Sequence, residues 1–128
     1  MSRSAHDRLR SAAEAARLIV DRSSGRTFND YLTDPAMRAM IERWLEKIGE
    51  ALVQAQRTLP VLDLAIPDIY AISGLRNRIA HDYDDLDADI IWAAVTHNVP
   101  RLIPVLDELG SMSESELVRR YGNNAGSG

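Results

Sequence analysis

Chemistry-bearing side chains are concentrated in residues 76–83, which read Arg-Asn-Arg-Ile-Ala-His-Asp-Tyr. Arg76 could bind and stabilise phosphoryl charge, because a planar guanidinium matches the geometry of phosphate oxygens. His81 could move protons near neutral pH, where an imidazole titrates. Asn77 could orient a phosphate or the imidazole, and Tyr83 offers a hydroxyl that can be modified. We therefore place the candidate active site in this stretch.

These residue types suit the cleavage of RNA without a metal ion. A base removes the 2′-hydroxyl proton, an acid protonates the leaving 5′-oxygen, and a cation stabilises the crowded phosphorane. His81 supplies the proton transfer and Arg76 supplies the cation. Residues five apart on an ideal helix point about 140° away from each other, so these two side chains do not share a face. Either the helix is distorted here, or the site forms in a cleft between two copies of the chain.

The composition indicates a small protein without disulfides. A chain of 128 residues can bury one core, and we expect one domain over residues 1–121 with a flexible tail at 122–128. The absence of cysteine excludes disulfides and thiolate metal sites. No apolar run approaches the ~20 residues of a membrane span, and the start lacks the apolar segment of a signal peptide. A cytoplasmic protein is therefore expected.

The charge distribution does not by itself indicate a nucleic-acid binder. The net charge is −4, whereas proteins that bind nucleic acids usually carry a basic patch. Residues 68–98 hold two arginines against six aspartates, which makes the candidate site the most acidic part of the chain. Binding of an RNA backbone would require the arginines to be grouped or to be supplied by a second chain.

Helical periodicity dominates the sequence, which predicts an all-α bundle of four main helices with short extra helices. The expected main helices end before Ser23-Ser24-Gly25, run from Pro35 to about Arg57, begin near Asp68 and enter the candidate site, and run from Asp87 to Gly110. Pro100 and Pro104 should kink the fourth helix, because each removes a backbone donor and crowds the preceding turn.

Polar residues mark where the helices begin. Asp34 is expected to cap the long second helix, with Pro35 in its first position, and Asp87 is expected to cap the fourth helix. Thr27 can cap a short turn. Ser113 together with Glu116 could form a capping box for a last short helix that ends near Tyr121.

The sequence resembles the HepT-type toxins of the HEPN family. The pattern Arg-Asn-x3-His-x-Tyr at residues 76–83 is similar to the signature of that family, and Gly49-Glu50-Ala51 resembles its Gly-Glu-Ala. The positions of Ile91-Trp92 and Val99-Pro100 relative to the pattern also fit. The combination is more specific than an arginine and a histidine alone, and the resemblance extends over most of the chain.

The resemblance implies a metal-independent endoribonuclease that works as a homodimer and needs no cofactor. It implies a HEPN-like four-helix bundle and a toxin of a type VII-like toxin–antitoxin system, whose partner is an MntA-like nucleotidyltransferase. That antitoxin would neutralise the toxin by transferring AMP to Tyr83. Carried over residue by residue, Arg76 and His81 are catalytic and Asn77 is a supporting polar group.

Two other functions remain open. The chain could be a non-catalytic helical binding partner of a minimal nucleotidyltransferase, or a purely structural bundle. In either case His81 could pair with Asp84 or Asp85 on a helix surface, and Tyr83 could be a packing residue. The aspartates between residues 82 and 89 suit a solvated loop and a helix cap better than a metal site.

Several residues near the family pattern also have simple structural explanations. Gly49 would let two helices approach closely, and Glu50 could be the buried partner of an arginine. Trp44 and Trp92 are expected to be anchors of the core or of a dimer contact.

Overall fold

The computed structural model describes residues 4–80 and 87–122, and within these ranges the chain is helical and contains no strand. The all-α prediction is therefore confirmed. The helical elements are α1 (Ala5–Ser23), α2 (Phe28–Thr33), α3 (Pro35–Thr58), α4 (Leu62–Ala65), α5 (Ile69–Ala80), α6 (Ala88–Ala93), η1 (Ala94–Asn98), α7 (Val99–Gly110), α8 (Glu114–Leu117) and η2 (Val118–Gly122). Of the predicted tail, only Gly122 lies within the described residues, where it is the last residue of η2.

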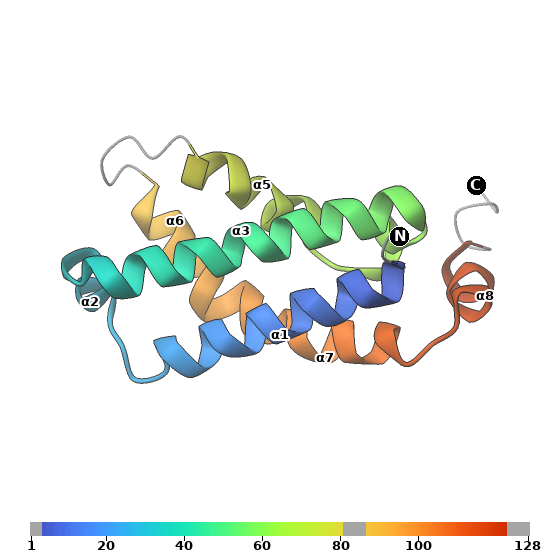
Figure 1. Cartoon of the computed structure of the whole chain (residues 1–128), viewed down its shortest axis with the longest axis horizontal. Helices are drawn as coiled ribbons and strands as arrows, with labels where there is room; N and C mark the ends of the chain where they lie inside the picture. Colours follow the sequence, from blue (N-terminus) through green and yellow to red (C-terminus); the bar gives the residue numbers. More distant parts are fainter. Residues whose placement is uncertain (1–3, 81–86, 123–128) are drawn as a thin grey trace.

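The long helix α3 lies at the centre of the arrangement. It packs against α1 on one side and against α5 on the other, and α1 also packs against α7 (Figure 1). The apolar stripe of α3, formed by Met37, Ile41, Trp44, Ile48 and Leu52, is buried in this core, with the exception of the half-buried Trp44. The apolar face of α5 is buried as well and consists of Ile69, Ile72, Leu75 and Ile79.

Local hydrogen bonds fix the helix starts as the sequence predicts. The Asp34 carboxylate accepts a bond from the Met37 amide at 3.1 Å, and Pro35 follows in the first helical position. Thr27 forms a reciprocal capping box with Asp30. The Ser113 hydroxyl accepts a bond from the Glu116 amide at 3.1 Å, so Ser113 caps the helix as predicted. The Glu116 carboxylate accepts from the same hydroxyl at 3.3 Å, which differs from the reciprocal backbone bond of the predicted capping box.

The predicted fourth helix is divided by a π-helical turn. The chain changes direction between α6 and α7, and the intervening residues form η1 (Figure 1). Pro100 occupies the second position of α7 and has no N–H to donate to the preceding turn, which accounts for the irregular hydrogen bonding there. Pro104 lies inside α7. The kink is therefore a widened turn just before the first proline.

One buried carboxylate is found, but it is Glu42 rather than Glu50. Among the described residues, Glu42 is the buried charged side chain, and its Oε2 accepts a bond from the Arg38 Nε at 3.2 Å. Glu50 is exposed, so the prediction of a buried role for it is wrong.

The aromatic side chains Tyr31 and Trp92 stack at 5.5 Å between ring centres. The Arg38 guanidinium lies 5.0 Å from the centre of the Tyr31 ring. Trp92 therefore anchors the core, as predicted.

Candidate functional site

Helix α5 carries part of the predicted site in its last two turns. Arg76 and Asn77 lie on this helix, which is described as far as Ala80. Arg76 is half-buried and Asn77 is exposed. His81 and Tyr83 lie outside the described residues. The structure thus locates the predicted cation and the supporting amide, and it shows which helix delivers the chain to the histidine.

The base of the Arg76 side chain is positioned by close packing between α5 and α3. A Cβ atom added at Gly49 would lie 3.4 Å from the Ser73 carbonyl oxygen and 3.6 Å from the Arg76 Cβ atom. A longer side chain at residue 49 would therefore occupy the space in which α5 lies. An alanine Cβ would fit here at ordinary van der Waals distance, so the packing excludes larger side chains at residue 49 but does not require glycine itself. The size of this residue of α3 therefore matters for the position of Arg76 on α5.

Arg78 lies on the opposite side of α5 and joins that helix to α6. On an α-helix, residues two positions apart are rotated by about 200° about the helix axis. Arg76 and Arg78 therefore point roughly 160° apart. The Arg78 Nη1 donates to the Asp87 Oδ1 at 2.8 Å, and both side chains are partly exposed. An exposed pair of this kind contributes about 0.2–1 kcal/mol. Its main effect is to hold together the two ends of the stretch that contains His81 and Tyr83.

Asp87 therefore has a different role from the one predicted. It occupies the cap position of α6, but its side chain makes no capping hydrogen bond and instead accepts from Arg78. The sequence places these two residues nine positions apart, and only the arrangement of α5 relative to α6 brings them together. No local pattern could have indicated this pair.

The two histidines within the described residues lie on other elements. His6 lies at the start of α1, and its Nε2 contacts the Met112 carbonyl oxygen. His97 is exposed on η1. The sequence has three histidines, so His81 is the one carried by the α5–α6 connection. Within residues 4–80 and 87–122, no group of three or more potential ligands is arranged to hold a metal ion.

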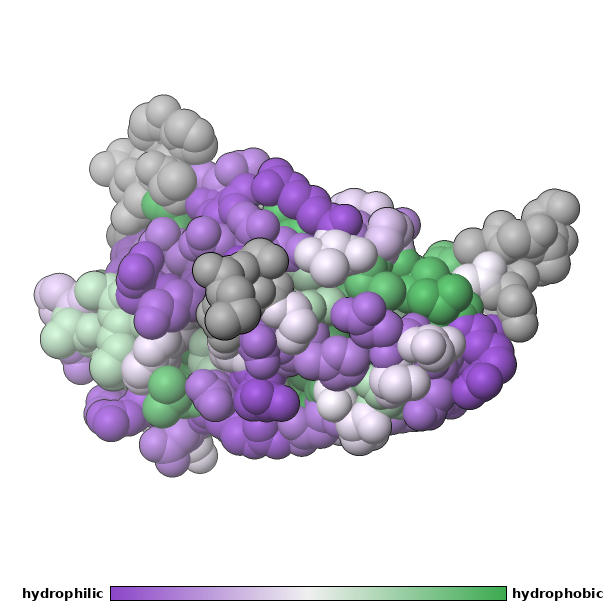
Figure 2. Space-filling model, turned by 45° about the vertical axis from the view of Figure 1, so that its right-hand side comes forward, coloured by the Kyte–Doolittle hydropathy of each residue, from purple (hydrophilic) through white to green (hydrophobic). Residues whose placement is uncertain are grey.

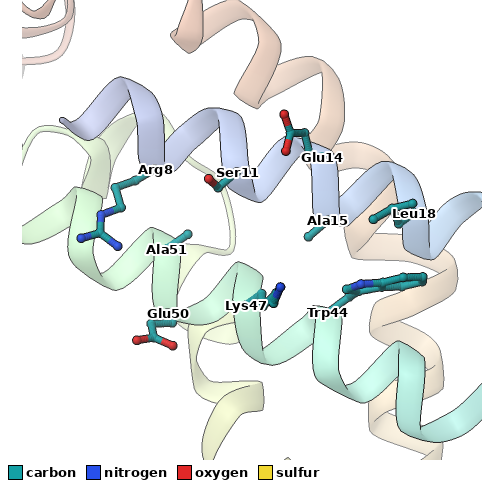
Figure 3. A pocket seen from close by; sticks show the side chains of 9 residues that line it. All are labelled: Arg8, Ser11, Glu14, Ala15, Leu18, Trp44, Lys47, Glu50 and Ala51. Carbon is teal, nitrogen blue, oxygen red and sulfur yellow. The ribbon is translucent and has the colours of Figure 1, made fainter. Parts of the chain in front are cut away.

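Two of the cavities beside the long helices bear on the candidate site, and the sequence predicted neither. One, of about 340 Å³, separates α5 from α6 and η1, and Arg78 is among its lining residues. The other, of about 370 Å³, lies between α1 and α3. In the second cavity Leu18 and Trp44 lie at one end, whereas Arg8 lies towards the other (Figure 3). This cavity is lined by side chains of both charges and by no histidine, so it does not form a cleavage site by itself.

The chain belongs to the ribonuclease HepT-like family, whose model matches residues 12–109. The matched range includes α3, α5 and the whole of residues 76–83. The resemblance to HepT-type HEPN toxins is therefore confirmed at the level of the family.

Individual relatives agree with this assignment. A protein of Thermococcus cleftensis named "Probable ribonuclease HepT" is 31% identical over 102 residues, which cover 80% of this chain and 92% of the relative. A protein of Caldanaerobacter subterraneus subsp. tengcongensis named "Putative RNase TTE0752" is 28% identical over 91 residues, which cover 71% and 80% of the two chains. No solved structure matches the chain. Among the described helices, none combines the length and apolar character needed to cross a membrane.

The packing at Gly49 leads to a prediction with a matched control. Gly49→Leu should displace α5 from α3 and move Arg76. If Arg76 acts in cleavage, as the family pattern predicts, RNA cleavage should fall by roughly tenfold or more, because small misplacements of a catalytic group are costly. Gly74→Leu is the control, since nothing lies within 4 Å of a Cβ atom added there. Circular dichroism and a cleavage assay on both variants test the prediction. Equal activity of the two leucine variants would show that α5 is not positioned through Gly49.

Proposed function

We propose that this chain is a metal-independent endoribonuclease that acts as a homodimer and is the toxin of a type VII-like toxin–antitoxin system. The match of the HepT-like family over residues 12–109 is the observation that carries the proposal. The names of the relatives add support, since those proteins are described as ribonucleases. The half-buried Arg76, held against α3, is consistent with a pre-positioned cation beside the residues that lead to His81.

The proposed reaction uses the 2′-hydroxyl of RNA as the nucleophile. The imidazole of His81 takes the proton from this hydroxyl while the 2′-oxygen forms a bond to phosphorus. The bond from phosphorus to the 5′-oxygen breaks, and this oxygen takes a proton from the protonated His81 of the second copy. Arg76 stabilises the charge of the phosphorane. The products are a 2′,3′-cyclic phosphate and a 5′-hydroxyl, so that no water or metal ion enters the step.

The dimer follows from the supply of catalytic groups. One chain offers a single histidine in its pattern, whereas the reaction needs a base and an acid. A two-fold axis near the ends of two α5 helices would supply both. The apolar stripe of α3 is buried in its own core, so we expect little of the contact to come from it. The face shown in Figure 2 is largely hydrophilic with separate apolar patches, which suits a contact with a large polar share.

The catalytic proposal predicts the loss of cleavage in two variants that should still fold. His81→Ala and Arg76→Ala should each lower RNA cleavage by roughly 100-fold or more. Arg76→Lys should recover little activity, because the bidentate guanidinium is lost. Cleavage should persist in the presence of a chelator and leave a 2′,3′-cyclic phosphate end.

Arg57→Ala serves as a matched control, since Arg57 is an exposed arginine at the end of α3. This variant should cleave RNA as the natural protein does. Expression of the variants that cleave RNA should arrest growth, and expression of the variants that have lost cleavage should not. This result would distinguish an enzyme from a protein that only binds the nucleotidyltransferase. A fully active His81→Ala protein, or cleavage abolished by the chelator, would rule out this mechanism.

The composite site predicts that an inactive chain silences a natural chain in the same dimer. Sedimentation should show a species of about twice the 14.3 kDa mass of one chain. When equal amounts of natural and His81→Ala chains are mixed and allowed to exchange, half of the dimers should be mixed, and each of these should hold only one of the two histidines that the reaction needs. Cleavage should therefore fall to about a quarter of that of the same total amount of natural protein, because about a quarter of the dimers keep both histidines. A fall to only about a half after confirmed exchange, as expected for sites that work independently in each chain, would contradict a site shared between chains.

The proposed control by an MntA-like nucleotidyltransferase concerns Tyr83. AMP on its hydroxyl would place a bulky anion where an RNA phosphate must approach. Tyr83→Phe should therefore cleave RNA normally, gain no AMP-sized mass from the antitoxin and ATP, and escape covalent inhibition. Intact mass and cleavage are measured together.

Tyr70→Phe is the matched control for this experiment. The Tyr70 side chain is 66% exposed, so another enzyme could reach it. A hydrogen bond with the Asp63 carboxylate raises the pKa of its hydroxyl. Tyr31 is fully buried and cannot be reached by another enzyme. Tyr70→Phe should be modified and silenced like the natural protein. An AMP-sized gain that persists in Tyr83→Phe would place the modification elsewhere.

A further inference from the structure

The cavity beside α5 has the size of a small-ligand pocket and lies on the helix that carries the candidate site. It encloses about 340 Å³, within the range of about 300–1,000 Å³ typical of pockets for small molecules. We name it the α5–η1 slot, and it is lined by Ala71, Ile72, Leu75, Arg78, Ile90, Ala93, Ala94 and Asn98. The slot exists because α5 packs extensively against α3 but makes few contacts with α6, η1 and α7.

The walls of the slot are apolar on both sides. Ile72 and Leu75 of α5 are buried and face the buried Ala94 at the start of η1 across the slot. The alanines at 71 and 93 are small and exposed, so they leave the entrance open. A nucleobase has two flat faces that favour apolar contact and a polar edge that requires hydrogen bonds. Two apolar walls meet the first of these requirements.

Asn98 can meet the second requirement. Its Nδ2 donates to the Asp68 Oδ2 at 3.3 Å, and because a carboxylate accepts only, this bond fixes which way the amide is turned. The amide keeps its Oδ1 acceptor and a second N–H donor. An adjacent donor and acceptor on one asparagine is the arrangement that pairs with the edge of a base.

A cation is present at the slot as well. Arg78 lines it, and the ion pair with Asp87 uses one Nη1 contact of a guanidinium that has five N–H donors. The remaining donors can bind a phosphate oxygen at the entrance. The slot therefore combines apolar walls, an oriented amide and a partly exposed guanidinium on one side of α5.

We propose that the α5–η1 slot binds a single nucleobase, with its edge on Asn98 and its phosphate near Arg78. The base comes either from the RNA substrate, in which case the inference rests on the proposed function, or from an adenine nucleotide. In the first case the slot sets a base preference near the cleavage position. In the second case it holds the adenine of AMP.

The test measures binding apart from cleavage. The full-length protein is titrated with AMP, GMP, CMP and UMP, and with ribose 5-phosphate as a probe without a base, by calorimetry or by NMR of the alanine methyl groups. At least one nucleotide should bind about tenfold more tightly than ribose 5-phosphate, because only the base can enter the slot. Equal binding of all five probes would overturn the proposal.

Two leucine variants test whether the nucleotide binds in the slot. Ala93→Leu fills the slot from an exposed helical position and should weaken nucleotide binding about tenfold or more. Ala39→Leu is the matched control, because Ala39 is an exposed alanine of α3 that does not line the slot, and it should bind as the natural protein does. Identical binding by the two leucine variants would refute the slot.

Asn98→Ala distinguishes the two sources of the base. A changed base preference at the RNA cleavage position would assign the slot to the substrate. Binding of AMP alone, with cleavage preference unchanged in Asn98→Ala, would assign it to an adenine nucleotide. If the natural protein cuts no RNA but binds a nucleotide that Ala93→Leu does not, the proposed function fails and the slot stands. If it cuts RNA but binds no nucleotide better than ribose 5-phosphate, the slot alone fails.

Discussion

Burial of the apolar face of α3 is the constraint on which the rest of the described structure depends. Ile41, Leu45, Ile48 and Leu52 are fully buried, and full burial of such a side chain is worth roughly 1.5–3 kcal/mol. Because this face is wide, one helix cannot cover it, and α1 and α5 pack on α3 from two sides. The position of α5, and with it the direction in which Arg76 points, is thus set by the packing of a helix that contributes no predicted catalytic residue.

The packing of α5 on α3 also determines the surroundings of the candidate site. Helix α5 meets α3 closely at Gly49, where the backbone of Ser73 and the base of Arg76 come near the glycine. On its other side it leaves a cavity towards η1, whose two polar lining residues, Arg78 and Asn98, pair with Asp87 and Asp68. One face of the helix is therefore rigidly packed, and the other is accessible to a ligand.

Electrostatics limits how a polyanion could approach this region. The chain is acidic overall, and aspartates are frequent around the α5–α6 connection. Opposing this charge, Arg76 and Arg78 leave opposite sides of α5 and do not form a single patch in one chain. In a dimer, the second copy would add two further guanidinium groups near the candidate site. They would change the electrostatic potential there more than any single side chain can. The proposed dimer thus serves both the proton transfers and the attraction of RNA.

The sequence by itself determined the features that depend on neighbours in the chain. The caps at Thr27, Asp34 and Ser113 were predictable, because each bonds to an amide three residues ahead. The family was also predictable, since its pattern lies within residues 76–83. His81 and Tyr83 remain predictions of that pattern, because they lie outside the described residues.

Tertiary structure decided the features that depend on which helix faces reach each other. It buries Glu42 and exposes Glu50, although both lie on α3, because burial depends on the direction of each side chain relative to the neighbouring helices. It turns Asp87 from a cap into the partner of Arg78, and it brings Asn98 to Asp68 across 30 residues of sequence. Contacts of this kind arise only after the helices have packed, so no local pattern of residues encodes them.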